Sequence, residues 1–237
     1  MNLQTLLETS TAPDFEVLGV AEHTAEVRPG YVFFGVAAND SDLNAHCRSA
    51  VSQGAVAILC DAQANAPDLG DVPVLAVADL ASRRGALAAR FYGDPSAHLA
   101  CIGITGTNGK TSVAYHIADL SKHLGEVCGY CGTLGWGTLD TLVDDGMTTS
   151  NAVAVQRQLA ALREHAAVTV AMEISSHALD QDRAAHVQFD VAVFTNLTRD
   201  HLDYHGTEAA YAAAKRKLFT DFDLRTAVIN VDDVFGK

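Results

Sequence analysis

The sequence predicts an α/β protein, with a small N-terminal α/β domain followed by a parallel sheet of phosphate-loop type flanked by helices. In both parts, helix-like segments alternate with short strands, which is the pattern of layered α/β domains. The strands of the second part are apolar throughout, as in a parallel sheet covered on both faces. The turn signal Gly93-Asp94-Pro95-Ser96 separates the two parts. We therefore place the domains at residues 1–99 and 100–237.

The first domain is expected to alternate strands and helices. The apolar spacing of Ala45, Cys47, Ala50 and Val51 predicts a helix that Gly54 ends. A second predicted helix is rich in Ala and Arg, and the predicted strands are short apolar runs. The expected strands are 31–36, 55–60 and 72–77, and the expected helices are 44–53 and 80–91.

The second domain opens with the sequence ACIGITGTNGKTS at residues 100–112. A strand, a Gly-rich loop and a helix-like pattern follow one another, as a phosphate-binding loop requires. Glycines let backbone N–H groups close on phosphate oxygens, Lys110 reaches the terminal phosphates, and Thr111 can hold Mg²⁺. The loop departs from the usual spacing, because Ile104 stands where the first glycine is expected and the glycines are at 103, 106 and 109. The alternative is a Gly-rich turn with a chance Gly-Lys-Thr.

The rest of the second domain alternates helices and strands. The first helix runs to about Leu124, where Gly125 ends it, and residues 129–146 are Gly-rich without a clear pattern. Ser150 or Asn151 can cap the next helix, which continues to about residue 165. We expect buried strands at 168–172, 191–195 and 227–230, and a helix over 208–219 that Thr207 caps.

Composition excludes several classes of function. With 49% apolar and 19% charged residues in 237, the chain is expected to be soluble and globular. The formal net charge of −13 argues against a nucleic-acid surface and a polybasic membrane patch. No stretch approaches the roughly 20 apolar residues of a membrane span, and the N-terminus lacks a signal-peptide pattern. We therefore expect a cytoplasmic protein without membrane insertion.

The cysteines are expected to be reduced. There are five, an odd number in a chain without an export signal. Cys128-Gly-Tyr-Cys131 forms a CxxC pair, but no second pair partners it. A buried structural role is therefore favoured over a redox or zinc role.

Polar residues follow the predicted strand at 168–172, where ligands bind in open α/β sheets. Glu173 fits the acid that binds magnesium in a phosphate-loop fold, and the alternative is an ordinary acid at a strand end. Ser175, Gln181 and Arg183 come next. The planar fork of Arg183 could clamp a carboxylate or phosphate, and the alternative is a surface arginine.

Two further segments contain candidate ligands. Residues 196–205 are rich in Asp and His, and Asn196 and His201 could meet a second metal ion or the nucleotide. The alternative is a polar loop capping the next helix. Lys215 lies on a helix beside small residues, and from local sequence alone it is a surface lysine.

Taken together, these segments resemble the Mur ligases of peptidoglycan synthesis, and among them the MurE type. MurE ligases add the third residue to the stem peptide of a UDP-muramyl dipeptide. The run at 26–35 is similar to the first domain of that family, although His23-Thr24-Ala25 stands where the family commonly has Asp-Ser-Arg. Five motifs carry the resemblance in the second domain: TGTNGKTS at 105–112, TTSNAVAVQ at 148–156, MEISSHALDQDR at 172–183, FTNLTRDHLDYHGT at 194–207 and YAAAKRKLF at 211–219.

The resemblance implies a role for each candidate residue. Residues 1–99 would bind the UDP-muramyl substrate, and 100–237 would form part of an ATP-binding domain. Lys215 matches a lysine that family members carry as a carbamate, and Lys110, Lys215 and His201 would be the catalytic residues. ATP would contact Gly106, Thr107, Asn108, Gly109, Lys110, Thr111, Ser112 and Asn196. Magnesium would contact Thr111, Glu173, His201 and carbamylated Lys215. The muramyl peptide would contact Thr148, Thr149, Ser175, Gln181 and Arg183.

The resemblance also implies the reaction and its reactants. The expected activity is ATP-dependent amide formation between UDP-N-acetylmuramoyl-L-Ala-D-Glu and a diamino acid, either meso-diaminopimelate or lysine, through an acyl phosphate. Full-length family members are roughly twice as long and complete the central sheet. We therefore expect a chain that is incomplete at its C-terminal end and binds ligands with little turnover. We also expect a monomer. The alternatives are a MurF-type or folylpolyglutamate-type ligase, or a non-catalytic nucleotide-binding module.

Overall fold

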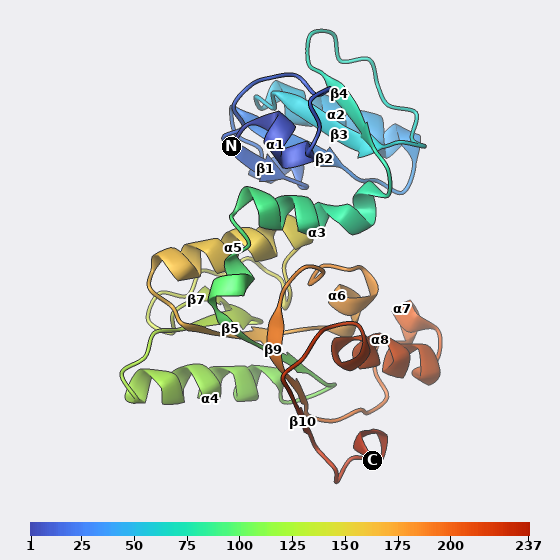
Figure 1. Ribbon diagram of the computed structural model, residues 1–237. Helices are drawn as coiled ribbons and strands as arrows, with labels where there is room; N and C mark the ends of the chain where they lie inside the picture. Colours follow the sequence, from blue (N-terminus) through green and yellow to red (C-terminus); the bar gives the residue numbers. More distant parts are fainter. The chain divides into compact units, whose positions relative to one another are not determined.

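The computed structural model describes residues 1–237, which form two compact units, Met1–Gly93 and Asp94–Lys237 (Figure 1). The unit boundary falls within the turn that separates the two parts in the sequence. Residues 94–99 belong to the second unit because the hydroxyl of Ser96 accepts a hydrogen bond from the Gln188 N–H at 3.1 Å. No helix in either unit has the length and apolar character needed to cross a membrane.

The first unit is a four-stranded sheet in the order β1-β2-β3-β4, and all its neighbouring strands are parallel. Helix α2 packs through Leu43, Cys47 and Ala50 on a core that contains Phe33 and Ile58. Helix α3 contacts β1, β3 and α1. The elements are α1 (Leu3–Leu7), β1 (Gly19–Ala21), η1 (Thr24–Glu26), β2 (Tyr31–Gly35), α2 (Asp40–Ser52), β3 (Ala57–Asp61), β4 (Val74–Val77) and α3 (Leu80–Phe91).

The second unit is a six-stranded sheet in the order β10-β9-β5-β8-β6-β7. Every neighbouring pair is parallel except β6 and β7. The carboxyl ends of the central strands β5, β8 and β9 therefore meet at one edge. The elements are η2 (Pro95–His98), β5 (Ala100–Thr105), α4 (Lys110–His123), β6 (Cys128–Gly132), β7 (Gly135–Gly137), α5 (Ala152–Glu164), β8 (Thr169–Glu173), α6 (Ser176–Asp180), β9 (Phe189–Phe194), α7 (Leu202–His205), α8 (Glu208–Thr220), β10 (Thr226–Ile229) and η3 (Val234–Gly236).

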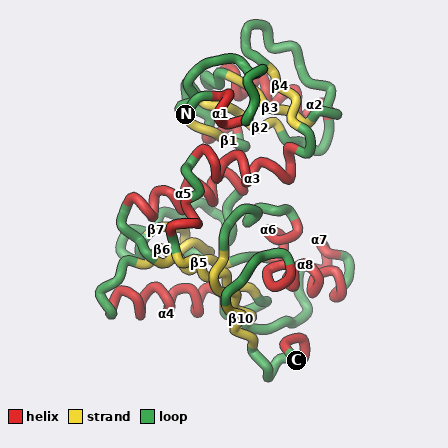
Figure 2. The backbone as a smooth tube through the Cα atoms, viewed as in Figure 1, coloured by secondary structure: helices red, strands yellow, loops and turns green.

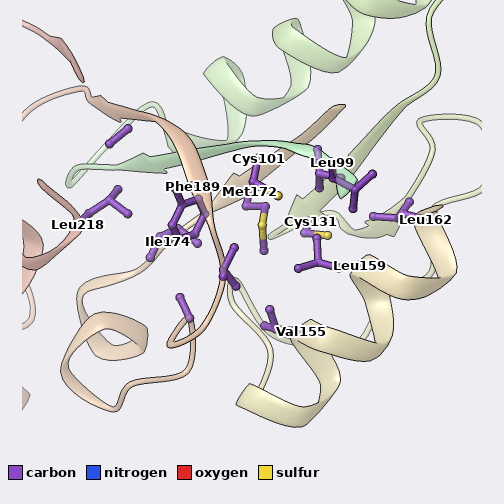
Figure 3. Close-up of a cluster of buried hydrophobic side chains, with 14 of the residues drawn as sticks. Leu99, Cys101, Cys131, Val155, Leu159, Leu162, Met172, Ile174, Phe189 and Leu218 are labelled. Carbon is purple, nitrogen blue, oxygen red and sulfur yellow. The ribbon is translucent and has the colours of Figure 1, made fainter. Parts of the chain in front are cut away.

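Helices cover both faces of the second sheet, and Figure 2 shows its strands between α4 and α5. Helix α4 packs on one face through Ala114 and Ala118. Helix α5 packs on the other through Val155, Leu159 and Leu162, whose side chains point toward the strands in Figure 3. Apolar strands between two helical layers explain why the sequence shows continuous apolar runs rather than alternation.

Helix starts agree with the capping residues expected from the sequence. The side chain of Asn151 accepts a hydrogen bond from the Ala154 N–H at 2.7 Å. The hydroxyl of Thr207 likewise accepts one from the Ala210 N–H at 3.1 Å. Each cap satisfies one of the N–H groups that a first helical turn leaves unpaired.

Three sequence expectations need correction. The segment 129–146 contains most of β6 and the antiparallel strand β7, so the second sheet is mixed rather than fully parallel. All four residues of β10 are exposed, although a buried strand was expected at 227–230, because β10 is the edge strand. Lys215 is only 2% exposed, so its local interpretation as a surface lysine is wrong.

The CxxC pair does not form a single site. Cys131 packs with the cluster beneath α5, whereas Cys128 packs with the cluster beneath α4. Residues three apart on a strand point to opposite faces, so the two thiols are separated by the sheet. Both are free and buried, and they have the structural role that was expected.

Candidate active site

The Gly-rich loop joins the end of β5 to the start of α4, as a phosphate-binding loop must. The side-chain ammonium of Lys110 donates to the carbonyls of Gly106 and Thr107 at 2.9 and 3.0 Å, which folds the lysine back over the loop. Asn196, after β9, pairs with the loop through both amide atoms. Its Oδ1 accepts from the Asn108 N–H at 3.1 Å, and its Nδ2 donates to the Asn108 carbonyl at 2.9 Å.

Two glycines allow the loop its shape. Gly109 precedes α4 with a φ of 86°, and Gly106 has a φ of 148°. A Cβ atom on Gly106 would lie 1.9 Å from the Thr195 hydroxyl oxygen, so no larger residue fits there. Ser112 is exposed in the first turn of α4. The loop therefore forms despite Ile104, which lies within β5.

Glu173 ends β8 beside the loop, because β5 and β8 pair with Ile104 opposite Glu173. The Thr111 hydroxyl donates to Glu173 Oε2 at 2.9 Å, so the two residues expected to serve magnesium are in contact. Magnesium is usually held by one or two protein oxygens together with substrate phosphates. The Thr111 hydroxyl and the Glu173 carboxylate are oxygen donors of the kind that such a site needs.

Lys215 reaches the same loop from α8. Its ammonium nitrogen donates to the Gly106 carbonyl at 2.7 Å and lies 4.6 Å from the centre of the Tyr211 ring. Burial and the positive charge of Lys110 lower the Lys215 pKa to about 7, although Asp200 opposes the shift. Burial also lowers the pKa of Lys110, against the attraction of Glu173 and Asp200. The carbonyl of Gly106 thus accepts hydrogen bonds from two lysines, the half-buried Lys110 and the buried Lys215.

The residues expected to hold the peptide substrate lie on the other side of Glu173. The Thr149 hydroxyl donates to the Glu173 carbonyl at 2.8 Å and accepts from the Ser175 N–H at 3.1 Å. Arg183 donates through Nη1 to the Thr149 carbonyl at 3.1 Å, and through Nη2 and Nε to Gln181 Oε1 at 2.6 and 2.9 Å. Arg183 is therefore fixed in orientation rather than free on the surface.

His201 lies in a cluster of rings at the edge of the site. Its ring centre is 4.9 Å from that of His177 and 5.9 Å from that of Tyr211. Its Nε2 is 3.5 Å from Asp200 Oδ2. Burial lowers the pKa of His177, and the neighbouring histidines His201 and His205 add to the shift. His201 and Lys215 therefore lie around the same Tyr211 ring.

Sequence reasoning missed three residues of the site. Tyr130 and Thr133 both hydrogen-bond Glu173, at 2.5 Å for the Tyr130 hydroxyl. The Tyr211 hydroxyl is 2.9 Å from the Thr107 hydroxyl in the loop. The first two lie in the Gly-rich segment that showed no pattern. Tyr211 lies in the motif at 211–219, four residues before Lys215. This spacing places both side chains on the same face of a helix, and it is the signal that could have revealed Tyr211.

The fold and the Gly-rich loop together define an α/β protein of the phosphate-loop class. The chain belongs to the Mur ligase family, since residues 104–237 match the model of the Mur ligase middle domain. This confirms the resemblance seen in the motifs.

Similar curated proteins share the MurE-type name. The Pseudomonas aeruginosa UDP-N-acetylmuramoyl-L-alanyl-D-glutamate--2,6-diaminopimelate ligase is 51% identical over 213 residues, which are 89% of this chain and 44% of that protein. The ligase of the same name from Alkalilimnicola ehrlichii is 44% identical over 99% of this chain and 49% of its own length. The chain thus spans about half the length of these relatives.

Solved structures agree with the fold. A structure of a UDP-N-acetylmuramoyl-L-alanyl-D-glutamate--2,6-diaminopimelate ligase superposes with a TM-score of 0.84 at 30% identity, over 100% of this chain and 48% of that one. MurF from Acinetobacter baumannii superposes with a TM-score of 0.71 at 20% identity, over 99% of this chain and 49% of that one. The second comparison shows a shared fold.

Proposed function

We propose that the whole protein is an ATP-dependent ligase that adds a diamino acid to UDP-N-acetylmuramoyl-L-Ala-D-Glu in peptidoglycan synthesis. The names of the similar ligases favour 2,6-diaminopimelate over lysine as that diamino acid. One observation carries the proposal. Glu173 contacts the phosphate loop through its carboxylate and the peptide-site residue Thr149 through its carbonyl, at 2.9 and 2.8 Å. A single residue therefore joins the two places where the reacting groups would meet.

In the proposed reaction, a carboxylate oxygen of the muramyl peptide attacks the γ-phosphorus of ATP, and ADP leaves. This step gives an acyl phosphate. The amine of the diamino acid then attacks its acyl carbon, phosphate leaves with the bonding electrons, and the nitrogen releases a proton as the amide forms. Lys110 and the loop N–H groups would neutralise and orient the phosphates. Arg183, held by Gln181 and Thr149, would bind a carboxylate of the peptide through its planar fork.

Mg²⁺ would be held by Thr111 and Glu173, with His201 and Lys215 serving a second ion. When bound, it would neutralise the charge that develops on the phosphates. Lys215 would act in its carbamylated form. The carbamate forms when the neutral side-chain amine attacks CO₂ and releases a proton. The low pKa of Lys215, about 7, supports this role because it supplies the neutral amine near physiological pH.

The test is calorimetric titration of the 237-residue chain with UDP-N-acetylmuramoyl-L-Ala-D-Glu. UDP-N-acetylglucosamine is the control, since it shares the UDP-sugar and lacks the lactyl peptide. Binding is the better readout because every residue assigned to this ligand lies within the chain. We expect selective binding of the muramyl dipeptide. Equal binding of both sugars, or no binding by the folded chain, would contradict the proposal.

A further inference from the structure

The turn between β6 and β7 surrounds the carboxylate of Glu173, the acid at the centre of the site. Glu173 is 1% exposed, so its two oxygens depend on protein donors. The donors come from Tyr130 in β6, from Thr133 in the turn that follows β6, and from Thr111. The turn has a Gly at 132 because a Cβ there would lie 2.2 Å from Glu173 Oε1 and 2.6 Å from the Tyr130 hydroxyl oxygen.

Strand β6 and the turn after it each give one donor to the same carboxylate oxygen. Oε1 accepts from the Tyr130 hydroxyl at 2.5 Å and from the Thr133 N–H at 2.9 Å. Tyr130 is fully buried, and its hydroxyl donates to the carboxylate from a fixed position in β6. A carboxylate held at one oxygen by two donors can turn little about its last bond.

The second carboxylate oxygen, Oε2, faces the phosphate loop. Oε2 accepts from the Thr111 hydroxyl at 2.9 Å and from the Thr133 hydroxyl at 3.2 Å. Thr133 therefore contacts both oxygens, with its N–H on one and its hydroxyl on the other. Thr111 is the only one of these donors that belongs to the phosphate loop.

Thr133 also reaches the peptide side of the site. Its hydroxyl oxygen is 3.1 Å from that of Thr148. Because a hydroxyl has one proton and Thr133 gives its own to Glu173, the Thr148 hydroxyl is the donor between the two threonines. The hydrogen bonds thus run in one direction, from Thr148 to Thr133 to Glu173.

We propose that Tyr130 and Thr133 form a carboxylate clamp that positions Glu173 for the metal and links it to Thr148. They are positioning residues, and the inference rests on the proposed function. The clamp holds Oε2 beside Thr111 before any ligand arrives, so the carboxylate loses less orientational freedom when a metal ion binds. Through Thr133, the orientation of the Glu173 carboxylate depends on Thr148, the threonine assigned to the peptide.

The test measures binding of a non-hydrolysable ATP analogue by calorimetry across a range of Mg²⁺ concentrations. Tyr130→Phe is expected to raise the Mg²⁺ concentration for half-maximal binding by about tenfold, because it removes a hydrogen bond to a charged group. Binding without metal should stay unchanged. Thr133→Val should raise the Mg²⁺ concentration for half-maximal nucleotide binding and also lower the affinity for the muramyl dipeptide. Thr133→Ser keeps the hydroxyl, so both values should stay close to those of the unmodified chain.

Matched controls separate positioning from structure. Tyr115→Phe removes a hydroxyl from a tyrosine on α4 that is 39% exposed. Thr138, just after β7, has a hydroxyl that lies 2.9 Å from the Thr141 hydroxyl, and Thr138→Val removes it. Neither should change the Mg²⁺ requirement. If Tyr130→Phe fails to fold, the exposed Thr133 decides the question.

Two outcomes have different meanings. If the unmodified chain needs Mg²⁺ for nucleotide binding but both clamp variants keep the same requirement, the clamp is wrong and the proposed function stands. If the unmodified chain binds nucleotide without regard to Mg²⁺, the proposed function fails, and the clamp fails with it.

Discussion

At the scale of single residues, Lys215 shows how burial changes chemistry. An ordinary lysine has a pKa of 10.5, and that of Lys215 is about 7. Near neutral pH a far larger share of Lys215 is therefore neutral than of an ordinary lysine. Since only the neutral amine attacks CO₂, carbamylation should favour Lys215 over the other lysines.

We expect a carbamate signal at Lys215 when the chain is studied by ¹³C NMR in labelled bicarbonate. The signal should fall as the pH drops below about 7, because the amine becomes protonated. Lys215→Arg should abolish it. Lys217→Arg, two residues further along α8 where the lysine contacts the Leu179 carbonyl instead of the loop, should leave it intact. A signal that persists in Lys215→Arg would assign the carbamate to another lysine.

The same shift predicts how stability depends on pH. The folded pKa of Lys215 lies below its unfolded value, so the folded state binds fewer protons between about pH 7 and 10.5. The cost of burying the charged amine is therefore present in full below pH 7 and is lost as the pH approaches 10.5. Lys215→Met should raise the free energy of unfolding by on the order of 2 kcal/mol at pH 6, and by less at pH 9. Denaturant titrations at the two pH values measure the difference, and an equal gain at both would contradict the burial explanation.

Arg183 gives a second prediction at this scale. Its guanidinium uses three nitrogens at once, on Gln181 and Thr149, a geometry that an ammonium cannot reproduce. Arg183→Lys should lower the affinity for the muramyl dipeptide by roughly 10-fold or more and leave the affinity for the Mg²⁺-nucleotide complex unchanged. Arg225→Lys is the control, since that side chain is 85% exposed. Equal losses for both ligands in Arg183→Lys would indicate a structural role instead.

At the scale of elements, the strand–loop–helix unit depends on Gly106. Alanine there would have both a positive φ and a Cβ 1.9 Å from the Thr195 hydroxyl oxygen. Gly125 is the matched control, because its φ is also positive, at 81°, but nothing lies within 4 Å of a Cβ. Gly125→Ala should cost about 1 kcal/mol in unfolding free energy, and Gly106→Ala clearly more.

Nucleotide binding distinguishes the two glycine variants further. Gly106→Ala must displace either Thr195 or the loop that two lysines contact, so it should also lose nucleotide affinity in calorimetry. Gly125→Ala should keep it. Similar stability and affinity in the two variants would show that the loop tolerates a side chain at 106.

The sequence predicted the elements that have strong local signals. Continuous apolar runs revealed β5, β8 and β9, and the capping residues Asn151 and Thr207 marked the starts of α5 and α8. The β6–β7 hairpin escaped prediction because its glycines make room for Glu173 and for neighbouring backbone, a tertiary reason that leaves no periodicity. The exposure of β10 depends on which strands lie beside it, and local composition does not record that.

The candidate site shows the same division. The phosphate loop and Glu173 follow from order along the chain, whereas the roles of Lys215 and the peptide-binding residues came from the family resemblance. Local sequence made Lys215 a surface residue, because nothing in YAAAKRK indicates that the loop at 106 lies against it. The contacts of Tyr130 and Thr133 were visible only once β6 and β8 were paired.

At the scale of the whole chain, the two units divide the proposed ligands between them. The residues assigned to ATP, 106–112 and 196, and those assigned to magnesium, 111, 173, 201 and 215, all lie in the unit Asp94–Lys237. The first unit is proposed to hold the UDP end of the muramyl substrate. Ligand binding protects the amides of the segments it stabilises against exchange, so the two ligands should leave different patterns.

Hydrogen exchange of the 237-residue chain, read by mass spectrometry, tests this division. The Mg²⁺ complex of a non-hydrolysable ATP analogue should slow exchange at 103–113 and at the end of β8, and leave residues 1–93 unchanged. UDP-N-acetylmuramoyl-L-Ala-D-Glu should slow exchange in the first unit and at 148–151 and 175–183. UDP alone should reproduce only the first-unit part, because it lacks the peptide. Protection of the first unit by the nucleotide, or of 103–113 by UDP, would overturn the assignment of ligands to units, since it would place the phosphates of one ligand in the unit assigned to the other.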